Sequence, residues 1–97
     1  MKHQHAIDLI ELSVEIMRRN VRLLAHPGDT HLLIQAFDRA ADALRGNRKA
    51  WYASTDLVVR EDVLIRLGDH AGELMAIGNV DAAREIEDAI IALKVTP

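Results

Sequence analysis

The chain has 97 residues, 49% of them hydrophobic and 28% charged, with a formal net charge of −3. These values indicate one soluble globular domain spanning residues 1–97, because the chain is too apolar for a disordered protein and too short for two hydrophobic cores. The acidic balance argues against a protein that coats nucleic acid or an anionic membrane, and the sequence has no cysteine for disulfides, thiolate catalysis or cysteine-based zinc sites.

The N-terminal segment MKHQHAIDLIELSVEIM is punctuated by Asp8, Glu11 and Glu15, so it lacks the uninterrupted apolar stretch of a signal peptide. No apolar run in the sequence approaches the roughly 18 residues that a membrane-spanning helix needs. We therefore expect a cytoplasmic protein that does not enter a membrane.

The same segment has the periodicity of an amphipathic helix, with large apolar residues at alternating steps of three and four. These residues are Ile7, Ile10, Val14, Met17, Val21 and Leu24. The chain then reaches HPGDTH at residues 26–31, where Pro27 disfavours helical geometry in the residue before it and Gly28 frees the backbone. Asp29 or Thr30 can cap the helix that follows.

A second apolar set lies on this first helix, about 130° around the axis from the main one. It consists of Leu9, Leu12, Ile16 and Leu23. The helix either lies centrally among helices of its own chain or uses these four residues as an oligomer interface with a second copy or another protein. We favour the interface, because a contiguous exposed apolar patch is an aggregation hazard in a monomer.

A second helix is predicted from about Thr30 to Arg45. Its buried face consists of Leu33, Phe37, Ala40 and Leu44. Gly46 stands where a left-handed C-terminal cap belongs, and residues 48–53 are expected to form one short extra turn.

The segment RGNRKAWY at residues 45–52 holds the chain's only Trp and only Tyr beside three cations. We favour packing of both aromatic rings into the core, because only 3% of the residues are aromatic and a small core needs large side chains to fill it. Two alternatives keep the rings at the surface: a protein-binding hot spot, or a site where a nucleotide or single-stranded nucleic acid stacks beside positive charge. The candidate partner-binding residues are Arg45, Arg48, Lys49, Trp51 and Tyr52.

Ser54, Thr55 and Asp56 are acceptable N-caps for a third helix that reaches about Ile77. The predicted buried stripe of this helix is Leu57, Leu64, Leu67, Ala71 and Leu74, flanked by Val63 and Met75. A row of small residues also follows the helix at four-residue steps: Gly68, Gly72 and Ala76. Because glycine weakens a helix but permits close approach, this row predicts a tight crossing by another helix, from this chain or a different one.

Gly78 and Asn79 break the chain before a last helix from about Val80 to Leu93. Its apolar face consists of Val80, Ala83, Ile86, Ile90 and Leu93. The four main helices and their short connections predict an all-α, small antiparallel helical bundle.

Two groups of residues include side chains of the kinds that bind metal ions. His26, Asp29 and His31 share one loop, but a zinc site needs three or four ligands and no further His or Cys is close in sequence. The carboxylates of the last two helices could hold Mg²⁺, yet only half of a paired acidic motif is present, and the pairs Asp62–Arg66 and Arg84–Asp88 are typical of a solvated helix face. We expect no metal, although a metal-dependent hydrolase using these carboxylates is the remaining enzymatic possibility.

No Ser, His and Asp combination or Gly-rich phosphate loop is recognisable, so no catalytic residue and no cofactor are expected. We predict a small non-enzymatic protein that binds another protein as a regulator, adaptor or inhibitor, as a homo-oligomer through its first helix. The alternative is a nucleotide or single-stranded nucleic-acid binding module centred on residues 45–52.

Overall fold

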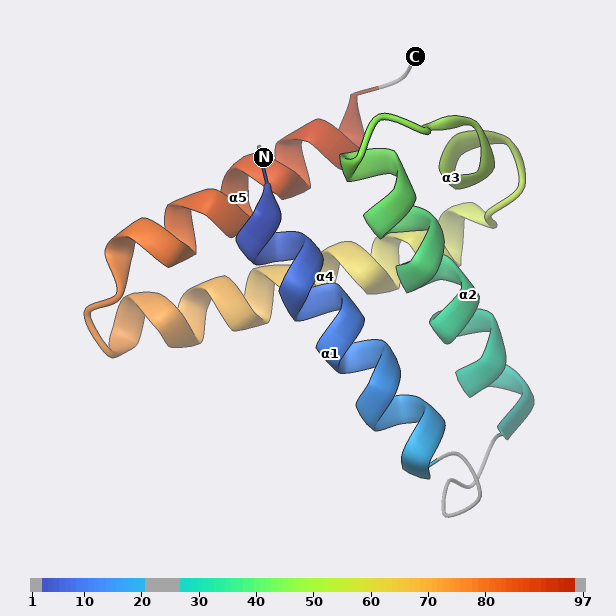
Figure 1. Ribbon diagram of the computed structural model, residues 1–97, viewed down its shortest axis with the longest axis horizontal. Helices are drawn as coiled ribbons and strands as arrows, with labels where there is room; N and C mark the ends of the chain where they lie inside the picture. The colour runs from blue at the N-terminus through green and yellow to red at the C-terminus, as the bar shows by residue number, and fades with distance from the viewer. Residues whose placement is uncertain (1–2, 21–26, 96–97) are drawn as a thin grey trace.

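The computed structural model describes residues 3–20 and 27–95, with side chains described over 3–20 and 30–95. Within these residues the chain forms five helices and no strand, which confirms the all-α prediction (Figure 1). The helices are α1 (Gln4–Asn20), α2 (Pro27–Leu44), α3 (Lys49–Ala53), α4 (Leu57–Ala76) and α5 (Val80–Lys94). None of them is both long and apolar enough to cross a lipid bilayer in the part of the chain described.

The helices form two antiparallel pairs that cross one another (Figure 1). α1 and α2 make one pair, and α4 and α5 make the other, which lies behind α1 in Figure 1. The short helix α3 connects the two pairs and packs on α2. This arrangement leaves each pair with one side toward the other pair and one side outward.

The core lies where the two pairs cross, and every helix contributes to it. Its largest fully buried side chains are Trp51, Ile7, Ile10, Leu67, Ile86 and Val63. Complete burial of an aliphatic or aromatic side chain of this kind stabilises a fold by about 1.5–3 kcal/mol. The predicted apolar stripes of the first, second and last helices supply much of this core, so periodicity identified the inward faces of these helices correctly.

The helix ends follow the predicted turn residues. Gly46 has φ of 115°, and the Asn47 N–H donates to the Asp42 carbonyl at 2.9 Å, which closes the C-terminal end of α2. The Asp56 side chain caps α4 by accepting from the Val58 N–H at 2.9 Å. Gly78, with φ of 84°, stands between α4 and α5.

The start of α2 differs from the prediction. α2 spans Pro27–Leu44, so Asp29 and Thr30 lie within the helix and not at the position before its first residue. Proline suits the first helical position because its fixed φ is already helical and its missing N–H has no intrahelical acceptor there. The helix was predicted to start at about Thr30, three residues after Pro27.

On α4 one prediction is corrected and another is narrowed to a helix from a different chain. Leu57 is predicted to lie in the buried stripe, but it is 59% exposed. It precedes the buried Val63 by six residues, which rotates it about 120° around the helix axis from Val63. Gly68 and Gly72 are not crossed by another helix of this chain: a methyl group placed on either would meet nothing from another part of the chain within 4 Å. The small-residue row therefore lies open on the surface.

Candidate protein-binding surfaces

The predicted oligomer interface on α1 is partly open. Leu12 is 54% exposed and Ile16 is 52% exposed, and they lie one helical turn apart. Leu9 is half-buried and packs against the core, and Leu23 lies outside the described residues. The chain thus shelters one member of the predicted set and leaves two large aliphatic side chains facing solvent.

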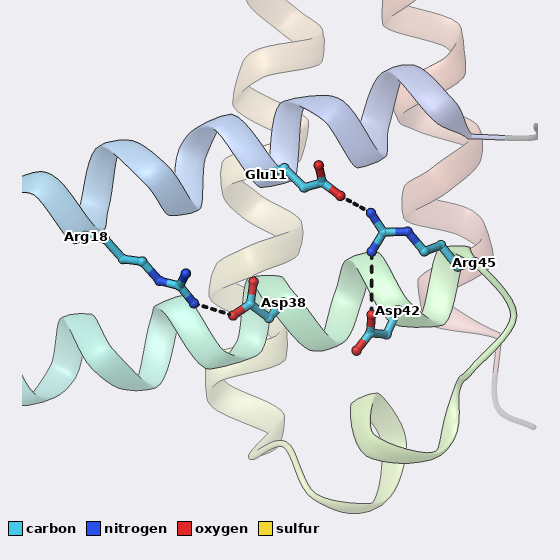
Figure 2. Close-up of polar contacts among 5 residues, drawn as sticks. All are labelled: Glu11, Arg18, Asp38, Asp42 and Arg45. Carbon is cyan, nitrogen blue, oxygen red and sulfur yellow. Dashed lines mark hydrogen bonds and ion pairs between the residues drawn. The ribbon is translucent and has the colours of Figure 1, made fainter.

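The other side of α1 is tied to α2 by ion pairs, which Figure 2 shows. Arg18 on α1 contacts Asp38 on α2 at 3.1 Å, and Arg45 pairs with Glu11 on α1 as well as with Asp42 at 3.5 Å. Ile16 follows Glu11 by five residues and is therefore rotated about 140° around α1 from this contact. Ile16 is therefore turned away from α2, whereas the buried apolar residues of α1 face the core.

A groove of about 690 Å³ lies between α1 and α2 over these ion pairs. Three arginines line it, Arg18, Arg19 and Arg45, and each pairs with a carboxylate of the same groove. Because the cations are already neutralised by their neighbours, the groove does not have the excess of positive charge that an anionic ligand needs.

The short helix α3 turns Trp51 into the core. The residue is 0% exposed, and its indole N–H donates to the Leu93 carbonyl on α5 at 3.0 Å. The Tyr52 hydroxyl donates to the same carbonyl at 2.9 Å, and its ring lies 5.9 Å from the Arg60 guanidinium carbon. Core packing was the favoured prediction for the aromatic pair, and it is confirmed for Trp51; Tyr52 is half-buried.

The burial of Trp51 changes the candidate partner-binding set. The indole is not open to a partner or to a nucleobase, so the nucleotide-binding alternative loses its main stacking group. Arg45 is engaged by two carboxylates, Arg48 is half-buried and Lys49 is exposed. Partner binding through Arg45, Arg48, Lys49 and the outer edge of Tyr52 stays a prediction.

The residues considered as metal ligands are not brought together in the described part of the chain. His26 and the side chain of Asp29 lie outside the described side chains, and no three His, Cys, Asp or Glu groups of the described part come together as a metal site. Asp62 pairs with Arg66 at 3.2 Å as predicted, whereas the described side chains of Arg84 and Asp88 form no such pair.

Sequence inspection missed one surface, a groove of about 520 Å³ along the outer side of the α4–α5 pair. Ile65 on α4 and Ile91 on α5 are 62% and 61% exposed on these two helices. The signal that could have revealed the groove was the row of Gly68, Gly72 and Ala76, whose open face continues it along α4.

No family model, curated protein or solved structure matches the chain. Its function is therefore inferred from the surfaces described above, in which the unusual feature is exposed aliphatic surface on two different helix pairs.

Proposed function

We propose that the protein acts by binding protein, as a small regulator, adaptor or inhibitor without a cofactor, and that it self-associates through α1. The observation that carries this proposal is the exposure of Leu12 and Ile16, at 54% and 52%, at positions i and i+4 of one helix. Side chains at this spacing form a continuous ridge, which is the form in which a helix presents itself to another helix.

A two-fold contact between α1 helices would place this ridge against its own copy. Burying the exposed halves of four such side chains contributes about 3–6 kcal/mol, taking about 1.5–3 kcal/mol for a fully buried one. Even before the cost of lost translational and rotational freedom is counted, this gain corresponds to a dissociation constant of about 40 μM to several millimolar, so the ridge alone supports only weak association. The contact is weak enough to be reversible and must be measured at high protein concentration.

The test replaces both residues by glutamate in the full chain, Leu12→Glu with Ile16→Glu, and measures mass by light scattering during size exclusion. Four carboxylates facing one another across the contact disfavour association, so we expect the variant to have a smaller mass than the unmodified chain at the same concentration. Circular dichroism checks that the helical content is unchanged.

Leu32→Glu is the matched control, because Leu32 is 54% exposed, like Leu12, but lies on α2. This control should keep the mass of the unmodified chain. Equal masses for the α1 variant and the unmodified chain would refute self-association through Leu12 and Ile16.

A further inference from the structure

The outer side of the α4–α5 pair carries a second apolar surface, on helices other than α1. Ile65 lies about 160° around α4 from the buried Leu67, so it faces away from the core. It is 62% exposed, and Ile91 on the adjacent helix is 61% exposed. Between the two helices runs the groove lined by Glu61, Leu64, Ile65, Gly68, Ile90 and Lys94.

The shape of α4 on this side suits another helix. Gly68, Gly72 and Ala76 are all exposed, and a side-chain methyl group on either glycine would be unobstructed by the rest of the chain. Each mid-helix glycine costs about 1 kcal/mol relative to alanine, and no described residue of the chain fills the space it leaves. Close approach of a helix from outside the chain does make use of it.

The groove is lined by one acidic and one basic side chain, which do not form an ion pair with each other. Glu61 on α4 and Lys94 on α5 line the same groove, and neither forms an ion pair within the described residues. A smaller pocket of about 210 Å³ at the same end is lined by Arg60, Glu61 and Lys94 together with apolar residues. The Arg60 Nε there is buried and has no hydrogen-bond partner in the described part of the chain.

We propose that this face docks a second copy of the chain, with the two-fold axis parallel to α4 and α5. In that arrangement α4 of each copy lies antiparallel on α5 of the other, and the two pairs form a four-helix bundle. Glu61 of each copy then faces Lys94 of the partner subunit, because these residues lie at one level of the antiparallel pair. Ile91 of the partner subunit, one turn before Lys94, then lies beside Ile65 of α4, and the small-residue row further along α4 permits close approach of the partner's helix.

The size of the face is sufficient for such a contact. α4 has 20 residues and α5 has 15, so they are about 30 Å and 22 Å long, and each presents a strip about 10 Å wide. The two strips amount to about 520 Å² per copy and about 1,000 Å² in total, which is the size of a weak, reversible protein interface. The ion pairs then set the orientation more than the affinity.

This inference goes beyond the proposed contact through α1, and the two are independent. Two different two-fold contacts on one chain produce assemblies larger than a dimer, whereas either contact alone produces only a dimer. The α1 variant, Leu12→Glu with Ile16→Glu, therefore isolates the α4–α5 contact in the full chain.

The experiment reverses the charges in that full-length variant and measures its dimer dissociation constant by sedimentation equilibrium. Glu61→Lys and Lys94→Glu should each raise the dissociation constant about tenfold or more, because each places two like-charge pairs in the contact. The two reversals combined should return it to within about threefold of the starting value, because the pairs re-form with opposite polarity. Glu73→Lys is the control, since Glu73 is an exposed carboxylate of α4 outside the groove.

A dimer that responds in this way establishes the contact. A monomer at every concentration, single reversals no more harmful than Glu73→Lys, or a double reversal without recovery each overturns it. The same reversals in the otherwise unmodified chain guard against a folding defect of the α1 variant. If the α1 variant has the mass of the unmodified chain while the reversals dissociate it, the α1 proposal fails and the α4–α5 contact stands.

Discussion

At the residue scale, Trp51 links the short helix α3 to the core and to the end of α5. Its ring fills the core, and its N–H reaches the Leu93 carbonyl, which lies in the last turn of α5. Carbonyl groups in the last turn of a helix have no intrahelical donor, so Trp51 and the Tyr52 hydroxyl satisfy one of these groups from outside. The pair thus fastens α3 to the end of α5 by both packing and hydrogen bonding.

This double role predicts the effect of substitutions at Trp51. Trp51→Ala should lower the free energy of unfolding by about 3–5 kcal/mol, because it leaves a large cavity. Tyr52→Phe should cost about 0.5–1.5 kcal/mol, because the Leu93 carbonyl keeps the indole as a donor. Urea unfolding followed by circular dichroism measures both, and a loss below about 1 kcal/mol for Trp51→Ala would place the indole outside the core.

At the scale of elements, ion pairs link α1 to α2 across the groove between them (Figure 2). All of the paired side chains are at least 40% exposed, and the Arg45 side chain is at that lower limit. Exposed pairs of this kind stabilise a protein by at most about 1 kcal/mol and are screened by salt. They orient the two helices, while the buried aliphatic residues hold them together.

Arg45→Gln should therefore lower the free energy of unfolding by less than about 1 kcal/mol in dilute buffer, and the difference should largely disappear near 1 M salt. Arg19→Gln is the control, because Arg19 pairs only with Glu15 on its own helix. Thermal unfolding at the two salt concentrations measures the effect. A loss of several kcal/mol that persists in salt would mean that these charges hold α1 on α2.

The helices themselves were predictable because the information for them is local. Apolar periodicity gave the inward faces, and Gly46, Asp56 and Gly78 marked helix ends through backbone and capping chemistry that acts within a few residues. The start of α2 was misplaced because Pro27 can either end one helix or open the next, and both uses satisfy the same local constraints.

The surfaces were less predictable because they depend on distant parts of the chain. Whether Trp51 is core or surface depends on a carbonyl 42 residues away, which no local pattern specifies. The helical wheel did identify Leu12 and Ile16 as a second apolar side of α1, but it could not show that Leu9 packs on the core. The glycine row predicted a crossing helix without saying from which chain; no described helix of this chain lies there, and a crossing by a different chain stays a prediction.

At the scale of the whole molecule, two crossed helix pairs enclose one core and leave aliphatic side chains on two outer surfaces. A chain of 97 residues buries a smaller fraction of its surface than a larger domain does, so association is an efficient way to shelter the remainder. We therefore propose that the protein works by self-association through α1.

Sedimentation equilibrium of the unmodified chain and of the Leu12→Glu, Ile16→Glu variant, up to high micromolar concentration, tests this self-association. We expect the unmodified chain to have an apparent mass above the 10.8 kDa of one chain that rises with concentration, and the variant to have a smaller mass at each concentration. A single species of 10.8 kDa at every concentration would contradict it.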